Sequence, residues 1–154
     1  MVVGRSELGD GRSEILMARN DKRIEQFEDL IAWQEARALA RGVYAAARTG
    51  LLAKDFGLRD QLQRAAVSVM SNIAEGFERI NRQEKLHFLN MARASGGEVR
   101  SLLYVCSDTG LLDDSTISKL QSSSIRTGRL ISGFMRSLRD RKVEVEVRSS
   151  EIAD

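Results

Sequence analysis

Apolar residues recur every three or four positions along four long segments of the chain, with polar residues between them. This spacing predicts amphipathic helices rather than strands, because one face of a helix returns about every 3.6 residues. The four segments are residues 29–48, 58–79, 81–109 and 116–142. Because no proline interrupts them and the loops between them are short, we predict an all-α fold. Its expected form is an antiparallel, up-down-up-down four-helix bundle.

Turn and capping residues indicate where the predicted helices begin and end. Asn81, with Glu84 three residues later, resembles a capping box and predicts the start of the third helix. Gly110 follows that helix, where a residue in the left-handed conformation is expected. Asp114 or Ser115 is expected to cap the fourth helix.

The two ends of the chain differ from the helical part. Residues 1–26 mix glycine, serine and charged residues, which predicts a flexible N-terminal tail before a bundle of residues 27–142. Residues 143–147 alternate valine with glutamate, a pattern that suits either an added edge strand or a tail. We favour the tail, so that residues 143–154 form an acidic C-terminal tail.

The second predicted helix has an unusually specific polar face. Serine and asparagine compete with the helix backbone for hydrogen bonds, so such residues on a helix usually have partners. We therefore expect an interhelical polar network, in which Arg64 and Arg100 form ion pairs with the acidic members. The members of this structural motif are Arg64, Ser71, Asn72, Glu75 and Glu98.

The fourth predicted helix has small residues in the middle of its core face. Ser124, Thr127 and Gly128 occupy positions where bulky apolar residues are usual. Either a large neighbour such as Trp33 fills the space, or the backbone of another helix approaches closely.

Positive charge is concentrated on the same helix. The net charge is +2, but residues 116–142 contain seven basic side chains and one acidic side chain. Four of the basic residues share one side, opposite the predicted core: Lys119, Arg126, Arg129 and Arg136. A side with this much positive charge is expected to bind phosphate groups. The alternative interpretation is an ordinary charged surface that contacts only solvent. No aromatic residue lies between them, so base stacking is not predicted there.

Residues that carry enzyme chemistry are scarce. Cys106, the one cysteine, shares an apolar stripe with Leu103 and is expected to be a buried hydrophobe. His87, the one histidine, is expected on a helix surface. Glu75 and Glu98 lack the Glu-x-x-His pairs of a di-metal bundle. We predict a non-enzymatic protein without metal or cofactor.

Other features bear on location and assembly. No signal-peptide pattern and no apolar run of membrane length is present, so we predict a cytoplasmic protein with no membrane partner. Several apolar residues fall outside the predicted core stripes, which favours contacts between subunits. They include Leu39, Leu102, Val105 and Met135.

Three segments carry a family resemblance. They are residues 27–36, 58–77 and 88–102, of which Ser71-Asn72-Ile73-Ala74-Glu75-Gly76 is the most specific. Here the chain resembles the four-helix bundle proteins called rRNA intervening-sequence proteins, after genes lodged inside large-subunit rRNA in some bacteria. The likeness covers roughly residues 27–112, with a divergent fourth helix.

This resemblance implies a homopentameric, barrel-like assembly of antiparallel bundles. It also implies a distant likeness to the accessory protein of diversity-generating retroelements, which partners a reverse transcriptase and RNA. The family usually has proline where this chain has Met70. Because a proline there would kink the helix, we expect the second helix to be straighter here.

Two functions from different classes remain. The first is an oligomer that associates with RNA through phosphate contacts on its basic side, which assembly would repeat into a larger surface. The second is a structural or adaptor oligomer that docks a protein partner, such as a polymerase or reverse transcriptase. Binding measured at two salt concentrations separates them, because phosphate contacts weaken steeply with salt.

Overall fold

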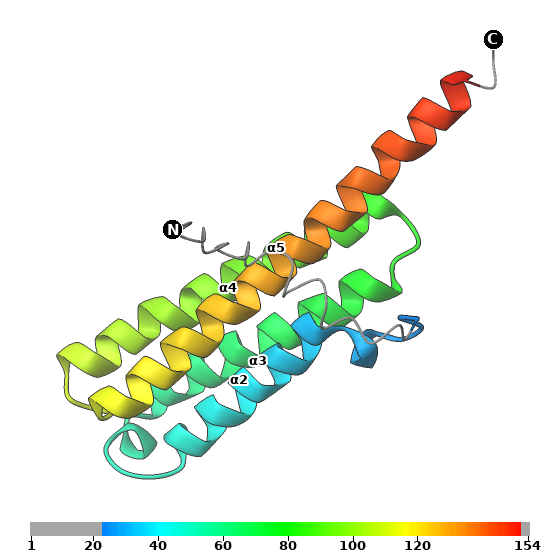
Figure 1. Cartoon of the computed structure of the whole chain (residues 1–154). Helices are drawn as coiled ribbons and strands as arrows, with labels where there is room; N and C mark the ends of the chain where they lie inside the picture. The colour runs from blue at the N-terminus through cyan, green and yellow to red at the C-terminus, as the bar shows by residue number, and fades with distance from the viewer. Residues whose placement is uncertain (1–22, 152–154) are drawn as a thin grey trace, which may run out of the picture.

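The computed structural model describes the backbone of residues 23–151 and the side chains of residues 23–140. Within that range the protein is all-helical and contains no strand, which confirms the predicted class. Four long helices and two 3₁₀ turns follow in the order η1 (Phe27–Asp29), α2 (Ile31–Ala47), η2 (Leu52–Lys54), α3 (Phe56–Glu78), α4 (Arg82–Asp108) and α5 (Asp114–Glu151). Figure 1 shows their arrangement. Most of the predicted N-terminal tail lies outside the described residues.

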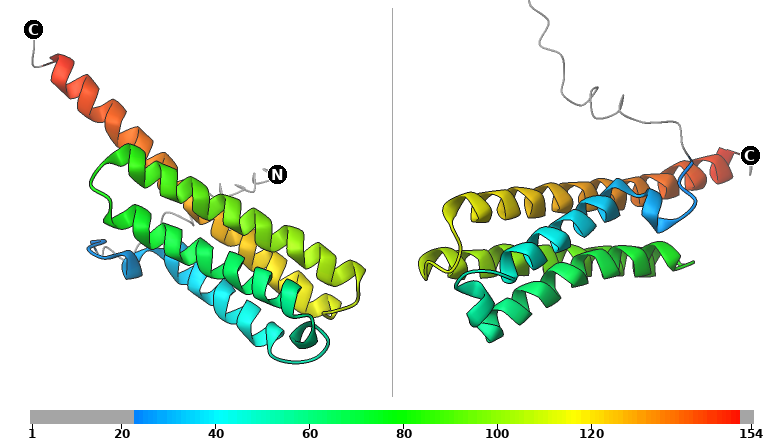
Figure 2. Two further views of the ribbon diagram at one scale, coloured as in Figure 1. Left: turned by 180° about the vertical axis from the view of Figure 1, so that it is seen from behind. Right: turned by 90° about the horizontal axis from the view of Figure 1, so that it is seen from below.

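Each long helix packs mainly against two others. α3 contacts α2 and α4, and α5 also contacts α2 and α4. The loops after α2 and α4 lie at one end of the molecule, and the loop after α3 lies at the other (Figures 1 and 2). Because α3 packs on α4 and α5 packs on α2, the α4/α5 pair lies opposite the α2/α3 pair.

Side chains cap α3 and α4 at their N-termini. The Asp55 carboxylate accepts a hydrogen bond from the Leu58 amide at 3.1 Å. The Asn81 side chain accepts one from the Gln83 amide at 2.7 Å, which confirms Asn81 as the predicted cap. Gly110 has a φ of +66°, as expected for the residue that ends α4.

The cap of α5 is Asp113, so the predicted caps Asp114 and Ser115 are wrong. Asp113 accepts hydrogen bonds from both the amide and the hydroxyl of Thr116, at 2.8 and 2.7 Å. These bonds favour the charged carboxylate and hold the pKa of Asp113 below its usual value. Thr116 lies three residues after Asp113, the spacing at which a capping side chain meets a free helix amide.

α5 is longer than predicted and continues to Glu151 rather than ending near Lys142. The alternating segment at residues 143–147 is helical, neither an edge strand nor an irregular tail. After Gly133 the sequence contains no glycine or proline, and its arginine, lysine and glutamate residues favour helix. Figure 1 shows this end of α5 projecting beyond the other helices.

Buried side chains form two groups along the helices. Leu62 and Leu103 belong to the group at one end, and Ile73 and Ile131 belong to the group at the other. Met70 packs against both groups. α3 runs without a break through Met70.

Most of the apolar residues expected to contact another subunit are buried within the single chain. Leu39, Leu102 and Met135 are 1%, 9% and 4% exposed, whereas Val105 is 43% exposed. The expectation is therefore wrong for the first three. Each helix has two neighbours, so its buried side is wider than one predicted stripe.

The small residues of α5 allow a close approach to α4. The Ser124 hydroxyl donates a hydrogen bond to the Gly96 carbonyl of α4 at 2.9 Å. Trp33 packs against the group of buried residues that contains Ile73 and Ile131. Close backbone approach, one of the two explanations offered by the sequence, is correct at Ser124. It does not apply at Gly128, where a Cβ would meet no other atom within 4 Å, so the expected core position of Gly128 is wrong.

Candidate nucleic-acid interface

One residue of the predicted polar motif is buried and forms part of a network. Asn72 is 9% exposed, and its Nδ2 donates to the Ser68 carbonyl at 2.9 Å and to Ser68 Oγ at 3.0 Å. Ser68 Oγ lies 2.8 Å from Ser95 Oγ on α4. The network joins two helices, but Asn72 reaches α4 through Ser68 rather than directly.

The other members of the motif lie on the surface: Arg64, Ser71, Glu75 and Glu98. In the part of the chain with described side chains, the ion pairs are Arg59–Asp60 and Arg126–Glu35. The expected ion pairs of Arg64 and Arg100 are therefore not formed. Helical spacing places these residues on the polar sides of α3 and α4. In the folded chain each of these helices is rotated about its own axis so that this polar side faces solvent rather than a neighbouring helix.

Replacing Asn72 with alanine is expected to lower the free energy of unfolding by about 1–2 kcal/mol. The buried Asn72 side chain loses two partly buried hydrogen bonds, each with a net contribution of about 1 kcal/mol. Urea unfolding measures the change, and Ser71→Ala, an exposed neighbour on the same helix, is the control with an expected change of about 0.5 kcal/mol or less. Unchanged stability with lost RNA binding would identify Asn72 as a ligand contact instead.

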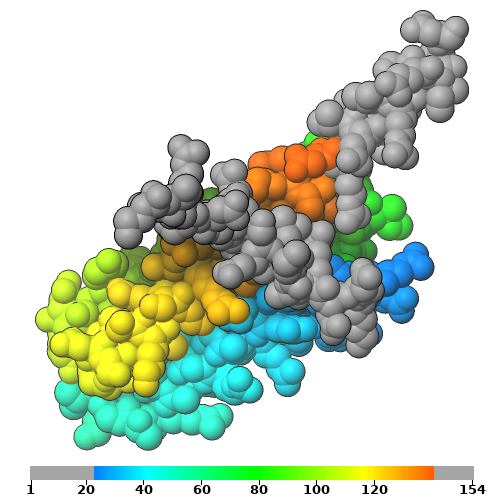
Figure 3. Space-filling view, in the orientation of Figure 1, coloured from blue at the N-terminus to red at the C-terminus, as the bar shows by residue number. Residues whose placement is uncertain are grey.

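The four basic residues predicted on α5 are exposed, but they divide between two sides of the helix. Arg126 Nη2 lies 3.1 Å from Glu35 Oε1 on α2. Lys119 lies seven residues earlier, almost two helical turns, and so on about the same side as Arg126. Arg129 and Arg136 instead line a groove toward α4. Figure 3 shows the face that α5 shares with α2.

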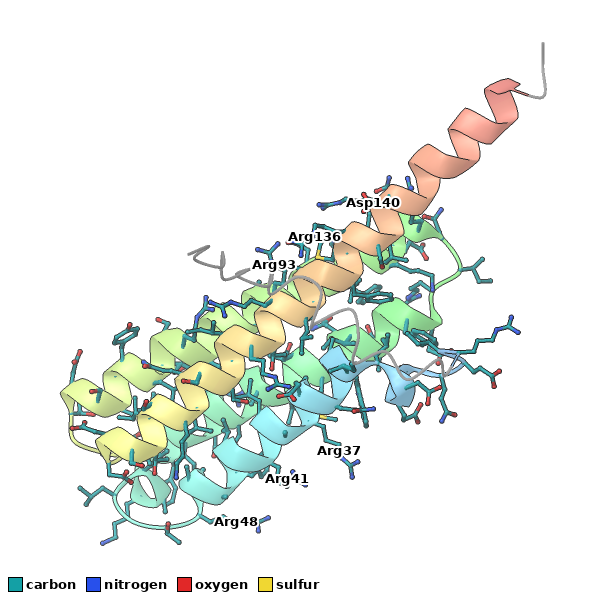
Figure 4. The ribbon with its side chains drawn as sticks, in the orientation of Figure 1. Arg37, Arg41, Arg48, Arg93, Arg136 and Asp140 are labelled. Atoms are coloured by element: carbon teal, nitrogen blue, oxygen red, sulfur yellow. The ribbon has the colours of Figure 1, made fainter. Side chains whose placement is uncertain are left out.

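The groove between α4 and α5 consists of two adjoining hollows that share Asn90 and Arg93. Six arginines line it, three from each helix: Arg82, Arg93 and Arg100 from α4, and Arg129, Arg136 and Arg139 from α5. None of the described residues along it is acidic. Figure 4 shows Arg93 and Arg136 together on this side of the molecule. We call this surface the α4/α5 groove.

The charges in the α4/α5 groove are locally uncompensated. None of its six arginines forms an ion pair with a carboxylate of the described side chains. The Arg82 guanidinium lies 3.5 Å from the Leu138 carbonyl of α5, which ties the two walls together at one end. Like charges gathered in a concave surface strengthen the field there and attract anions.

The hollow that Arg129 and Arg136 line is open at Gly128. A Cβ placed on Gly128 would meet no other atom within 4 Å. A Cβ on Gly97 would approach only Arg100 Nη2, at 3.9 Å. An anionic ligand can therefore lie close to the backbone between the two rows of arginine side chains.

The residues weighed for enzyme chemistry lie in unremarkable surroundings. Cys106 is buried, as predicted, and burial together with the nearby charge of Asp55 raises the pKa of its thiol. His87 is exposed and lines the α4/α5 groove. Among the described residues, no three His, Cys, Asp or Glu side chains are grouped to hold a metal ion.

None of the described helices is long and apolar enough to cross a bilayer.

Of the six groove arginines, sequence reasoning placed Arg129 and Arg136 in a binding site. It assigned Arg100 to an ion pair, counted Arg139 only toward the charge of its helix, and missed Arg82 and Arg93. They are separated from each other and from Arg100 by eleven and seven residues, which are spacings that return to one side of a helix. That signal was present in the sequence. The spacing indicates a shared binding surface only once the structure shows that this side of α4 lies beside the arginines of α5.

The sequence also matches a family model. The model of the 23S rRNA-intervening sequence protein matches residues 28–133, which include all of α2, α3 and α4 and about half of α5. The chain belongs to this family. The family assignment confirms the resemblance seen in residues 27–112.

A solved structure supports the fold of this family member. It is a protein of unknown function from the S23 ribosomal protein family of Bacteroides thetaiotaomicron. The two structures align with a TM-score of 0.63 and 18% sequence identity, over 68% of this chain and 98% of that chain. At this identity the likeness supports the fold alone. Comparison with curated proteins finds no match.

Proposed function

We propose that this protein is a non-enzymatic, cytoplasmic, RNA-associated protein that binds the phosphate backbone in the α4/α5 groove. The observation that carries the proposal is the set of six arginines lining one groove without an acidic residue among its described neighbours. Arginine suits this role because its planar guanidinium donates paired hydrogen bonds to phosphate oxygens.

The length of the groove suits a run of phosphates. Arg82 and Arg100 are eighteen residues apart on α4, which corresponds to about 27 Å along the helix axis. Successive phosphates on one strand of a duplex are spaced by about 3.4 Å along its axis. Several phosphates can thus contact arginines at once. No phenylalanine, tyrosine or tryptophan lines the groove, so binding depends on the backbone rather than on the bases.

The proposal includes assembly into a homopentamer of antiparallel, up-down-up-down bundles. It is supported by the family resemblance and by apolar side chains that remain exposed on α4, including Tyr104 and Val105. Light scattering is expected to give about five times the chain mass of 17.2 kDa. A mass equal to one chain at every protein concentration would contradict the pentamer.

The second candidate function is an adaptor that docks a protein such as a polymerase or reverse transcriptase. The exposed side chain of Tyr104, with 63% of its surface accessible, favours this candidate, because tyrosine is enriched in protein interfaces. An adaptor of this kind binds an acidic protein and has little affinity for bare RNA at physiological salt.

The test is a titration of the wild-type protein with a structured RNA at two salt concentrations. Phosphate binding gives measurable affinity that falls steeply with salt, with a slope of about 0.9 in log affinity for each duplex phosphate contact. RNA of unrelated sequence binds equally well, because phosphates carry no base information. Absence of RNA binding at low salt would remove this proposal and favour the adaptor.

A further inference from the structure

A second row of arginines follows the outer side of α2, away from the α4/α5 groove. Arg37, Arg41 and Arg48 are all exposed, and their spacing of four and seven residues places them along one side of the helix. Figure 4 shows these three side chains along one edge of the molecule and Arg93 and Arg136 on the opposite edge. The two basic surfaces are therefore separate.

This row also lacks local compensation by acidic groups. The one acidic residue of α2, Glu35, pairs with Arg126 of α5 on another side of the helix. None of the three arginines forms an ion pair with any carboxylate that the structure describes. Their charges are available to an external anion.

Unlike the groove, this row has aromatic side chains next to its cations. Tyr44 lies between Arg41 and Arg48 and is 37% exposed. Its ring makes no aromatic or cation–π contact within the described part of the chain. Trp33 lies one turn before Arg37, whose guanidinium carbon is 5.7 Å from the centre of the indole ring. Proteins hold unpaired bases and their phosphates by such combinations of cations and neighbouring aromatic rings.

We propose that Arg37, Arg41, Tyr44 and Arg48 form a second nucleic-acid site, specific for a single strand. The arginines bind phosphates and the exposed ring of Tyr44 stacks on one unpaired base, which a duplex does not offer. Arg37 and Arg48 are eleven residues apart, about 16 Å along the helix, which spans about five nucleotides spaced as in a stacked strand. With the groove also occupied, one chain holds two segments of nucleic acid on opposite sides.

The single tryptophan of the chain allows this site to be tested directly. Because Arg37 lies over Trp33, a strand bound along α2 changes the fluorescence of Trp33. The probe is a single-stranded RNA of mixed sequence and about 12 nucleotides, compared with the duplex of the same sequence. We expect the fluorescence to change with the single strand at concentrations at which the duplex has little effect.

Two variants of the row identify the contacts. Arg41→Gln with Arg48→Gln is expected to remove the Trp33 response, and Arg37 is left in place because its loss would alter the fluorescence itself. Tyr44→Leu is expected to weaken single-strand binding about tenfold, the size of one lost stacking contact, whereas Tyr44→Phe keeps it. Circular dichroism checks that each variant is folded.

The groove variant Arg129→Gln with Arg136→Gln separates this proposal from the proposed function. It is expected to keep the full Trp33 response, even where its binding to structured RNA is lost. The second site is overturned if Trp33 does not respond in the wild-type protein, or if the response disappears in the groove variant. It is also overturned if Tyr44→Leu binds the single strand as tightly as the wild type.

Discussion

Replacing Arg129 and Arg136 together by glutamine is expected to weaken binding to structured RNA by about 30-fold near 0.15 M salt. Each phosphate contact on a duplex contributes about 0.9 to the slope of log affinity against log salt, which corresponds to about fivefold in affinity at that concentration. Two lost contacts should also make the slope shallower by about 1.8. The loss should be the same for RNAs of different sequence, because both arginines contact phosphate.

The matched control replaces Lys119 and Arg126 by glutamine on the same helix. Both double variants remove two positive charges, so long-range attraction falls equally in the two proteins. Lys119 and Arg126 lie outside the groove, and Arg126 already contacts Glu35. A smaller loss of affinity is therefore expected for the control. Equal losses in the two variants would mean that RNA responds to overall charge rather than to the groove.

Replacing Gly76 by leucine is expected to destabilise the fold by about 3 kcal/mol or more. Gly76 is buried at the end of the Ser71–Gly76 motif. A Cβ there would lie 3.1 Å from Phe88 Cβ and 3.2 Å from the Lys85 carbonyl oxygen of α4. Neither atom can move without shifting the backbone of α4. Urea unfolding measures the change where the variant folds, and loss of helical circular dichroism reports it where the variant does not.

Gly128→Leu is the control for this substitution. Both glycines lie inside long helices, so both variants gain similar helix propensity, about 0.8–1 kcal/mol relative to glycine. A Cβ at Gly128 meets no atom within 4 Å, so this variant is expected to keep or slightly exceed wild-type stability. Equal stability of the two variants would show that the close packing of α3 on α4 is not what requires glycine at position 76.

The sequence determined the local features of this protein. Periodic apolar residues located the four helices, because a helix that buries one side has apolar residues at every third or fourth position of its sequence. Asn81 as a cap, Gly110 as the residue after α4, and the burial of Cys106 were predictable for the same reason. Each depends on residues within a few positions of one another. The family resemblance was equally local, since it depended on short segments such as Ser71–Gly76.

Only the tertiary structure decided which sides of different helices meet. The spacing of Arg129 and Arg136 placed them on one side of α5, but their partnership with Arg93 and Arg100 depends on how α4 is rotated beside α5. The same rotation left Glu75 and Glu98 exposed, where the sequence suggested ion pairs. Helical periodicity specifies the angle of a side chain about its own axis. The angle between that side chain and a neighbouring helix is set by packing of the whole core, which no single helix encodes.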